Sequence, residues 1–489
     1  MSVLKMTIDS SNRISKINKE IYGHFSEHLG RCIYGGIYVG EDSPIPNVRG
    51  IRTDVVEAFK AIKVPVVRWP GGCFADTYHW MDGIGPKESR KKIVNTNWGG
   101  VTEDNSFGTH EFLDFCEQVG CEAYVSVNVG SGTVQEAHDW VEYMTSSNDS
   151  PMTELRKRNG RQEPWKVKFI GIGNENWGCG GCMSKEYYSD LYRQFQQFIG
   201  WGSQKIACGP SSNDSDWTDT MMRKCNPGMM QGLSLHHYTI PTGNWQHKGS
   251  SVDFDKKEYY DTLSRTWYME RILRDQKGVM QRYDDEKRIG LCVDEWGIWT
   301  DVMEGTNPGF LYQQNSMRDA ILASINLNLF NLNSDRVKMA NIAQIVNVLQ
   351  AIVLTEGEKM VLTPTYHVFD MFKEHMEATL VYSNIENKQL VEGEYLPAVS
   401  QSVSVDDEGR MHITISNASL DEDFEIDCAM PRTGFKSATT RVLTAEYNKC
   451  NTFEEPNAVA PKTCDCVKLD GEKLSFKLPK CSVVAIELC

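Results

Sequence analysis

The feature that most constrains this chain is a series of short apolar runs that alternate with helical patterns between about residues 20 and 345. Such alternation is typical of repeated β/α units around a parallel sheet. Eight runs qualify: Ile21 to Phe25, Val64 to Trp69, Ala123 to Asn128, Phe169 to Asn174, Lys205 to Gly209, Leu233 to Tyr238, Ile289 to Glu295 and Val337 to Ile342. Eight units predict an α/β fold, a closed (β/α)₈ barrel.

The pattern changes after Phe372, where apolar and polar residues begin to alternate, as in Leu474, Phe476 and Leu478. A period of two predicts antiparallel strands, here of a β-sandwich. The first residues of the chain alternate in the same way. We therefore expect residues 1–15 to be a strand that joins the sandwich, residues 16–378 to be a catalytic barrel, and residues 379–489 to be the sandwich itself.

Charge and composition exclude several classes of protein. The formal net charge of −15 would repel a nucleic acid backbone, and no apolar run is long enough to span a membrane. The first residues lack a basic segment followed by an apolar one, so no secretory signal is predicted and we expect a cytoplasmic protein. The 15 cysteines are odd in number and scattered, which favours reduced thiols over a disulfide framework.

Polar side chains follow the predicted barrel strands, and catalytic side chains of such barrels lie at these carboxyl ends. The fourth run ends in Asn174-Glu175 and the seventh in Asp294-Glu295, while Trp98 lies in a Gly-rich loop. Carboxylates and amides bind sugar hydroxyls, and planar rings cover the apolar faces of sugars. The strand ends therefore predict a carbohydrate pocket.

Glu175 and Glu295 are the candidates for a pair of catalytic carboxyl groups. Glycoside cleavage needs one protonated carboxyl group for the leaving group and one ionised carboxylate that attacks or activates water. A single strand-end glutamate is more often part of a structural ion pair, but two, each behind an apolar strand and close to a tryptophan, favour catalysis. Their separation decides between retention and inversion of configuration. A bell-shaped dependence of rate on pH is predicted.

Several motifs identify the chain as similar to the family 51 α-L-arabinofuranosidases. They are Tyr22 to Gly30 (YGHFSEHLG), Arg68 to Asp76 (RWPGGCFAD), Gly173 to Gly178 (GNENWG), Asp294 to Trp296 (DEW), Asn341 to Val348 (NIAQIVNV) and Leu362 to His367 (LTPTYH). The resemblance implies a TIM barrel with a C-terminal jelly-roll-like sandwich. It also implies retaining hydrolysis that releases terminal arabinofuranosyl groups from arabinan, arabinoxylan or derived oligosaccharides, without a cofactor, and a homo-oligomer, often a hexamer.

The same resemblance assigns roles to individual residues. It implies that Glu175 is the general acid/base, that Glu295 is the nucleophile and that Asn174 binds the sugar 2-hydroxyl. The other residues implied in substrate binding are Glu27, Cys73, Tyr238, Gln344 and Trp98, although some members carry Asn at the position of Cys73. Arg68 and His236 are predicted to support the carboxylates, with a structural ion pair as the alternative for Arg68.

Other interpretations remain open at this stage. A β-xylosidase or an endoglucanase on a related barrel is the alternative enzyme, and a non-catalytic carbohydrate-binding protein is the alternative from another class. Cys179 and Cys182, Cys464 and Cys466, and the pair His236-His237 invite a metal site. None of them has a second ligand pair at zinc-site spacing, so no metal is predicted.

Overall fold

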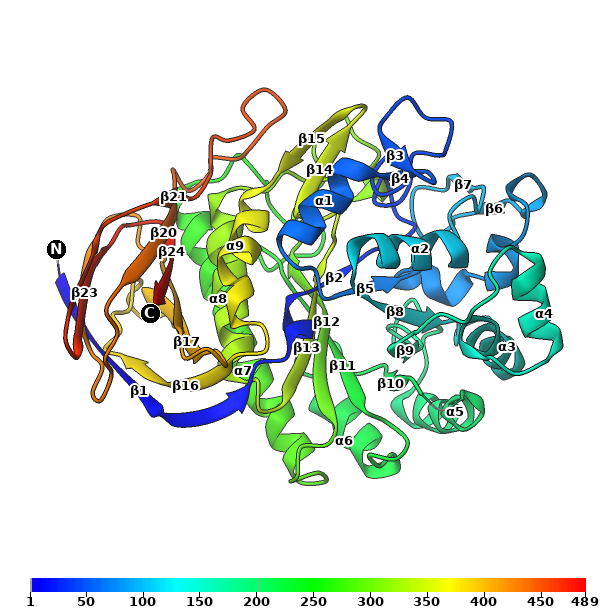
Figure 1. The fold of residues 1–489 in the computed structure, drawn as a ribbon, viewed down its shortest axis with the longest axis horizontal. Helices are drawn as coiled ribbons and strands as arrows, with labels where there is room; N and C mark the ends of the chain where they lie inside the picture. The colour runs from blue at the N-terminus through cyan, green and yellow to red at the C-terminus, as the bar shows by residue number, and fades with distance from the viewer. Residues whose placement is uncertain (1, 201) are drawn as a thin grey trace.

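The computed structural model describes residues 2–200 and 202–489. Its larger part contains a closed barrel of eight parallel strands, which lies to the right of the curled sheet in Figure 1. These strands are β2 (Gly23–Phe25), β5 (Val66–Trp69), β8 (Glu122–Val127), β9 (Phe169–Ile172), β10 (Gln204–Ala207), β11 (Gly232–Thr239), β12 (Gly290–Ile298) and β13 (Val337–Ala343). All eight predicted runs form barrel strands, and the predicted fold class is confirmed.

Helices cover the outside of the barrel, as Figure 1 shows. They are α1 (Thr53–Ala61), α2 (Thr109–Val119), α3 (Val134–Thr145), α4 (Pro151–Arg158), α5 (Lys185–Phe198), α6 (Ser215–Lys224), α7 (Lys256–Gln281), α8 (Met317–Leu332) and α9 (Pro364–Phe372). Short hairpins extend the loops: β3 (Asn47–Val48) with β4 (Ile51–Arg52), β6 (Ile93–Val94) with β7 (Thr102–Glu103), and β14 (Val353–Glu356) with β15 (Lys359–Leu362). Among the described residues, no helix is long and apolar enough to cross a membrane.

The remaining strands form one ten-stranded sheet beside the barrel. They are β1 (Ser2–Lys16), β16 (Thr379–Ile385), β17 (Val399–Val405), β18 (Met411–Asn417), β19 (Phe424–Ala429), β20 (Ala438–Thr444), β21 (Lys462–Thr463), β22 (Val467–Asp470), β23 (Lys473–Leu478) and β24 (Ser482–Leu488). The sheet curls so that both halves contribute to one apolar core, which includes Leu4, Val381, Ile413, Phe476 and Ile486. Strand β1 lies near its middle, antiparallel to β16 and parallel to β19.

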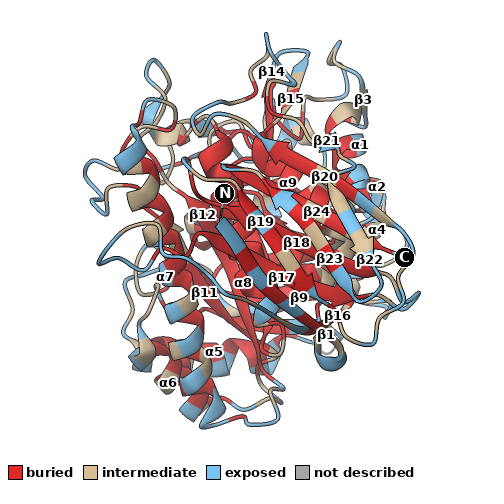
Figure 2. Ribbon diagram, turned by 90° about the vertical axis from the view of Figure 1, so that its left-hand side faces the viewer, coloured by how far each residue is buried: buried red, intermediate tan, exposed pale blue. Residues whose placement is uncertain are grey.

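Helix α8 lies between the barrel and the curled sheet, and Figure 2 shows it as buried. Its polar residue Asn328 donates to Ser400 Oγ at 3.0 Å and accepts from Ser402 Oγ and Thr414 Oγ1, each at 2.8 Å. Because all four side chains are buried, these hydrogen bonds replace water that the interface excludes. The helix therefore fixes the curled sheet against the wall of the barrel.

Candidate active site

Glu175 follows the carboxyl end of β9, and Glu295 lies in the C-terminal half of β12, with β10 and β11 between these two strands. Glu175 follows β9 after Gly173, and both residues have positive φ, 86° for Gly173 and 41° for Glu175. A left-handed backbone is uncommon for a glutamate and costs about 1–3 kcal/mol, a strain that proteins typically hold at functional sites. The turn takes the chain out of the strand direction as soon as the strand ends, and Gly178 and Gly180 close it by donating to Glu175 O.

Glu295 is buried and held by two donors. Arg68 Nη1 lies 2.8 Å from Oε1, and the Tyr238 hydroxyl donates to Oε2 at 2.8 Å. Burial raises the pKa of Glu295, whereas the charges of His236 and Arg68 lower it. Arg68, which was predicted to support the carboxylates, contacts Glu295, and so does Tyr238, for which the resemblance implied a role in substrate binding.

His236 joins the two glutamates. The register pairs it with Glu295 across β11 and β12, and its Nδ1 lies 2.9 Å from Glu175 Oε1 and 3.5 Å from Glu295 Oε2. Its Nε2 lies 3.3 Å from Asp294 Oδ1. Burial alone would lower the pKa of His236, but the charge of Glu295 and the hydrogen bonds to Asp294 and Glu175 raise it to about 10. The histidine is therefore a buried cation among carboxylates.

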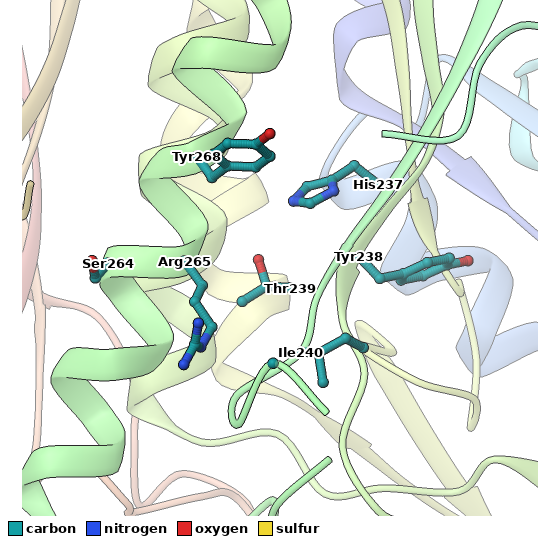
Figure 3. A pocket seen from close by; sticks show the side chains of 8 residues that line it. His237, Tyr238, Thr239, Ile240, Ser264, Arg265 and Tyr268 are labelled. Carbon is teal, nitrogen blue, oxygen red and sulfur yellow. The ribbon is translucent and has the colours of Figure 1, made fainter. Parts of the chain in front are cut away.

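His237, the next residue, points to the other side of β11. Figure 3 shows it facing Tyr268 of α7, while Tyr238 points the opposite way. Its Nδ1 lies 3.1 Å from Ser212 Oγ, and its ring centroid lies 6.0 Å from that of Tyr268. Because side chains alternate along a strand, only one of the two histidines lies with the glutamates.

Glu27 is surrounded by donors. The Oε1 atom accepts from the backbone N–H groups of Gly72 and Phe74, each at 3.0 Å, and from Trp98 Nε1 at 2.9 Å. Gln344 Nε2 donates to Oε2 at 3.0 Å. Burial raises the pKa of Glu27 to about 7 in spite of these bonds. Three predicted substrate-binding residues, Glu27, Trp98 and Gln344, thus form one hydrogen-bonded group.

Asn174 lies beside this group and is fixed by Arg68, whose Nη2 donates to Asn174 Oδ1 at 2.5 Å. The amide Nδ2 is left facing Cys179 Sγ at 3.8 Å. Arg68 thereby binds Glu295 with Nη1 and Asn174, the residue before Glu175, with Nη2. Such a planar fork fixes both partners at once.

The cysteines correct the sequence analysis. Cys73 forms a disulfide with Cys179, 106 residues later, and Cys464 forms one with Cys466. The expectation of reduced thiols is therefore wrong for these four cysteines, while the other eleven are free. Cys73 therefore offers no free thiol to a substrate, and Cys182 is unpaired and exposed. The loops after β5 and β9 bring the first pair together, a proximity that no spacing in the sequence reveals.

The Cys73–Cys179 disulfide lies against the acid candidate, because Cys179 Sγ is 3.6 Å from Glu175 Oε2. Donor atoms of Cys73, Glu175 and Cys179 lie within 4.8 Å of one another, as do those of Glu175, His236 and Glu295. The disulfide occupies both sulfurs of the first group. In the second group the ring nitrogen is already directed at carboxylate oxygens, an arrangement that suits proton sharing.

A glycine leaves room for the nucleophile candidate. A Cβ on Gly72 would lie 2.8 Å from Glu295 Oε1 and 3.3 Å from the Phe25 ring. The backbone at residue 72 therefore passes against the carboxylate so closely that no side chain fits. This close approach explains one glycine of the Arg68 to Asp76 motif.

An aromatic row continues outward from the site. The ring of Tyr238 lies 5.1 Å from that of Trp299, which lies 5.3 Å from that of Trp245. Trp245 is 55 % exposed. An exposed indole ring next to a polar pocket suits the apolar face of a sugar, and Trp245 was not singled out from the sequence.

Asp294 is the main residue of the site that the sequence analysis did not assign. It is fully buried below the glutamates, where Ser234 Oγ donates to Oδ1 at 2.5 Å and Tyr124 OH donates to Oδ2 at 2.7 Å. Arg68 and His236 hold its pKa well below the usual range against the effect of burial. Its place directly before Glu295 in a strand was the available signal.

A barrel with two strand-end glutamates around a buried cation defines the class of protein, a glycoside hydrolase. The chain is 51 % identical over 490 residues to an intracellular exo-α-L-arabinofuranosidase of Bacteroides ovatus, with 99 % of this chain and 95 % of the relative covered. Models of the α-L-arabinofuranosidase 1 domain and C-terminal domain match residues 58–258 and 294–482. The chain belongs to the α-L-arabinofuranosidases of glycoside hydrolase family 51.

Solved structures agree with this placement. The GH51 arabinofuranosidase from Xanthomonas axonopodis pv. citri is similar with a TM-score of 0.98 at 44 % identity, and all of both chains is covered. The α-L-arabinofuranosidase from Thermotoga maritima, solved as an arabinose complex, has a TM-score of 0.88 at 31 % identity over 99 % of each chain. The family named from the sequence motifs is thereby confirmed.

Proposed function

We propose that this enzyme is an exo-acting, retaining α-L-arabinofuranosidase that removes terminal non-reducing arabinofuranosyl groups from arabinan, arabinoxylan or their oligosaccharides. The observation that carries the proposal is the spacing of its two glutamates. Oxygens of Glu175 and Glu295 lie within 4.8 Å of each other. Inverting enzymes need about 6.5–9.5 Å between the carboxyl groups, to leave room for water, and retaining enzymes about 5–5.5 Å.

In the first step Glu295 attacks the anomeric carbon and Glu175 gives a proton to the leaving oxygen. The C–O bond to the leaving group breaks as the ester bond to Glu295 forms. Arg68 and Tyr238 keep the attacking carboxylate oriented, since each contacts one of its two oxygens. Their hydrogen bonds also favour the ionised form of Glu295 over the protonated one.

In the second step water attacks the glycosyl ester and Glu175 takes up a proton from it. The ester bond breaks, which releases arabinose and returns Glu295 to the carboxylate. We assign the binding of the sugar 2-hydroxyl to Asn174, whose side chain is fixed by Arg68. Glu27, with Trp98 and Gln344, supplies further acceptors and donors for hydroxyls of the sugar.

Proton NMR of the products of an aryl α-L-arabinofuranoside tests substrate and stereochemistry together. We expect the first arabinose formed to have the α configuration of the substrate, with the β anomer appearing only by later mutarotation. Initial release of the β anomer would contradict the retaining mechanism. Equal or faster hydrolysis of the aryl β-xyloside would contradict the arabinofuranoside specificity. Binding of arabino-oligosaccharides without hydrolysis would contradict the proposal that the protein is a hydrolase.

We extend the proposal to the setting of the enzyme. The Bacteroides ovatus relative is named as intracellular, which supports the same location for this chain. The family resemblance supports a homo-oligomer, often a hexamer. Cell fractionation and light scattering on the purified protein test these two points separately.

A further inference from the structure

Asp294 on β12 forms the floor of the catalytic site together with Ser234 and His236 from the adjacent strand β11 and Tyr124 from β8 across the barrel. Its carboxylate accepts from Ser234 on β11 and Tyr124 on β8, and it faces Nε2 of His236 at 3.3 Å. The guanidinium of Arg68 makes no close contact with the carboxylate of Asp294. The Nε atom of Arg68 is 3.9 Å away, and Nη1 contacts the backbone oxygen of Asp294 and the carboxylate of Glu295.

The charged and titratable groups that contact His236, or interact with the carboxylates it faces, come from several strands of the barrel. They are Arg68 on β5, Tyr124 on β8, Glu175 after β9, Cys208 after β10, Tyr238 on β11, and Asp294 and Glu295 on β12. Three carboxyl groups thus share two possible cations, Arg68 and His236. One of the three must hold or share a proton if the general acid is to be ready for catalysis.

The position of the imidazole decides where its protons can be. Both ring nitrogens of His236 face carboxylate oxygens, and a neutral ring carries a lone pair on one of them. A lone pair directed at the ionised, buried Asp294 would be repulsive, because neither group could turn to water. Nε2 must therefore carry hydrogen, which leaves Nδ1 as the atom that faces Glu175 and changes its protonation.

We propose that Asp294 is a positioning residue that keeps a proton on Nε2 of His236, so that Nδ1 and Glu175 share the proton that catalysis delivers. The idea rests on the acid role proposed for Glu175. The proton moves from Nδ1 to Glu175 Oε1 along the 2.9 Å contact, and His236 becomes the neutral Nε2–H form. Glu175 then gives that proton to the leaving oxygen. The proton taken from water in the second step returns by the same path.

The electrostatics agree with this order of protonation. The pKa of His236 is raised to about 10 against the effect of burial, and that of Asp294 is held well below its usual range. The proposal places the stored proton on Nδ1 at neutral pH, along the 2.9 Å contact with Glu175, and Asp294 stays an acceptor throughout. Ser234 donates to Oδ1 of Asp294 and Tyr124 donates to Oδ2, and these two hydrogen bonds fix the orientation of the carboxylate toward His236.

Asp294→Asn tests the proposal, because it keeps the shape of the side chain and removes the charge. The measurement is kcat/KM across pH for aryl α-L-arabinofuranosides with good and poor leaving groups. We expect a loss of about 10–100-fold for the phenyl substrate and of less than about 3-fold for the dinitrophenyl substrate, which needs no proton. The basic limb should move to lower pH by about one unit, because His236⁺ has lost its anion. Equal losses on both substrates, with the limb unmoved, would overturn the proposal.

Ser234→Ala is the matched control. It removes a hydrogen bond to the same carboxylate but keeps the charge, so the basic limb should stay in place or move to higher pH. A downward displacement as large as that of Asp294→Asn would show that packing, and not the charge, matters. Thermal unfolding of both variants establishes that they are folded.

A second measurement needs neither substrate nor an altered Asp294. ¹⁵N NMR of histidine-labelled enzyme, with the His236 signals assigned by their loss in His236→Gln, reports the protonation of each ring nitrogen. We expect Nε2 to carry hydrogen from pH 5 to pH 9, and Nδ1 to be protonated at pH 7. An unprotonated Nε2 at pH 7 overturns the proposal. If the proposed arabinofuranosidase activity were wrong, the product analysis would show it. The ¹⁵N spectrum of His236 would not be affected by that result.

Discussion

Single residues decide the chemistry of this site, and the two glutamates differ by what surrounds them. Glu295 lies between Arg68 and Tyr238, whereas Glu175 contacts His236 and the sulfur of Cys179. The strand-end position of both glutamates was predictable, because an apolar run that stops at a carboxylate marks the carboxyl end of a barrel strand. Arg68 and His236 were predicted to support the carboxylates, but which atoms meet was not predictable, because both side chains come from other strands than the glutamates they contact.

Replacing each glutamate by alanine should separate the two roles. Glu295→Ala should lower kcat/KM at least about 10³-fold on every aryl α-L-arabinofuranoside, because no group is left to attack. Glu175→Ala should lose about 10²–10⁴-fold on poor leaving groups and much less on dinitrophenyl arabinofuranoside. Added azide, with the configuration of the glycosyl azide determined by NMR, checks the assignment. The Glu175 variant should give the retained product, and the Glu295 variant the inverted one; the reverse result exchanges the roles.

We expect the acidic limb of the rate profile to belong to Glu295, because the proposed nucleophile cannot attack when it is protonated. Tyr238→Phe removes a hydrogen bond to the ionised form, so the pKa of Glu295 should rise further. Activity would then be lost at a higher pH as the solution is acidified. The acidic limb of kcat/KM should move upward by about 0.5–1 pH unit. An acidic limb that is unmoved or moves downward contradicts this account of the Tyr238 hydroxyl.

Gly72→Ala should impair catalysis by steric contact with the nucleophile. The added carbon would lie 2.8 Å from Glu295 Oε1, so the carboxylate must move, and a shift of about 1 Å can cost about 100-fold in rate. Gly278→Ala in helix α7 is the control, since a Cβ there meets nothing within 4 Å. Steady-state kinetics of both variants check this. Similar activity of the two variants would contradict this prediction, because it would mean that the loop around residue 72 can move to accommodate the added carbon.

At the scale of elements, the loops after β5 and β9 work as one unit because Cys73 and Cys179 join them. The loop after β9 is also fixed from inside, where Asn176 Nδ2 donates to Gly180 O at 2.7 Å and Trp177 Nε1 donates to Gly209 O at 3.1 Å. The sequence identified both loops as parts of the pocket. It did not predict that Cys179 pairs with Cys73, because the contact depends on strands that lie far apart in the chain.

Loss of the Cys73–Cys179 disulfide should destabilise the enzyme. A cross-link between residues 106 apart restricts the unfolded chain, and its removal by Cys179→Ser should cost about 2–4 kcal/mol. Denaturant unfolding measures the difference, with Cys182→Ser as the control at an unpaired, exposed neighbour. Thiol titration of the denatured, unreduced protein should find 11 free thiols, the 15 cysteines less the 4 in disulfides. Fifteen reactive thiols would contradict the pairing.

At the scale of the whole molecule, the barrel and the curled sheet share one buried interface. Helix α8 packs on both, and strand β1 begins the chain in the sheet before the barrel starts. Period-two alternation predicted the strand character of both ends of the chain. It did not specify that β1 would lie parallel to β19, because pairing register depends on contacts across more than 400 residues.

Asn328→Ala should weaken this interface. The change leaves the hydroxyls of Ser402 and Thr414 without their buried acceptor, at a cost of about 1–3 kcal/mol. We expect a lower Tm by calorimetry and an unchanged KM, because Asn328 lies on helix α8 outside the barrel and its side chain bonds to the curled sheet. Asn148→Ala, at an exposed position, should leave Tm unchanged. Equal Tm values for the two variants would contradict the role of Asn328.

The sequence by itself determined the barrel, the order of its strands and the two carboxylates that end the fourth and seventh of them. Those features follow from local periodicity and from where each apolar run stops. Only the tertiary structure decided that Cys73 meets Cys179, that Arg68 holds Glu295 and Asn174 together, and that Asp294 lies beneath His236. The physical reason is that closure of the barrel places residues from distant strands within hydrogen-bond distance, and no local pattern records which atoms then meet.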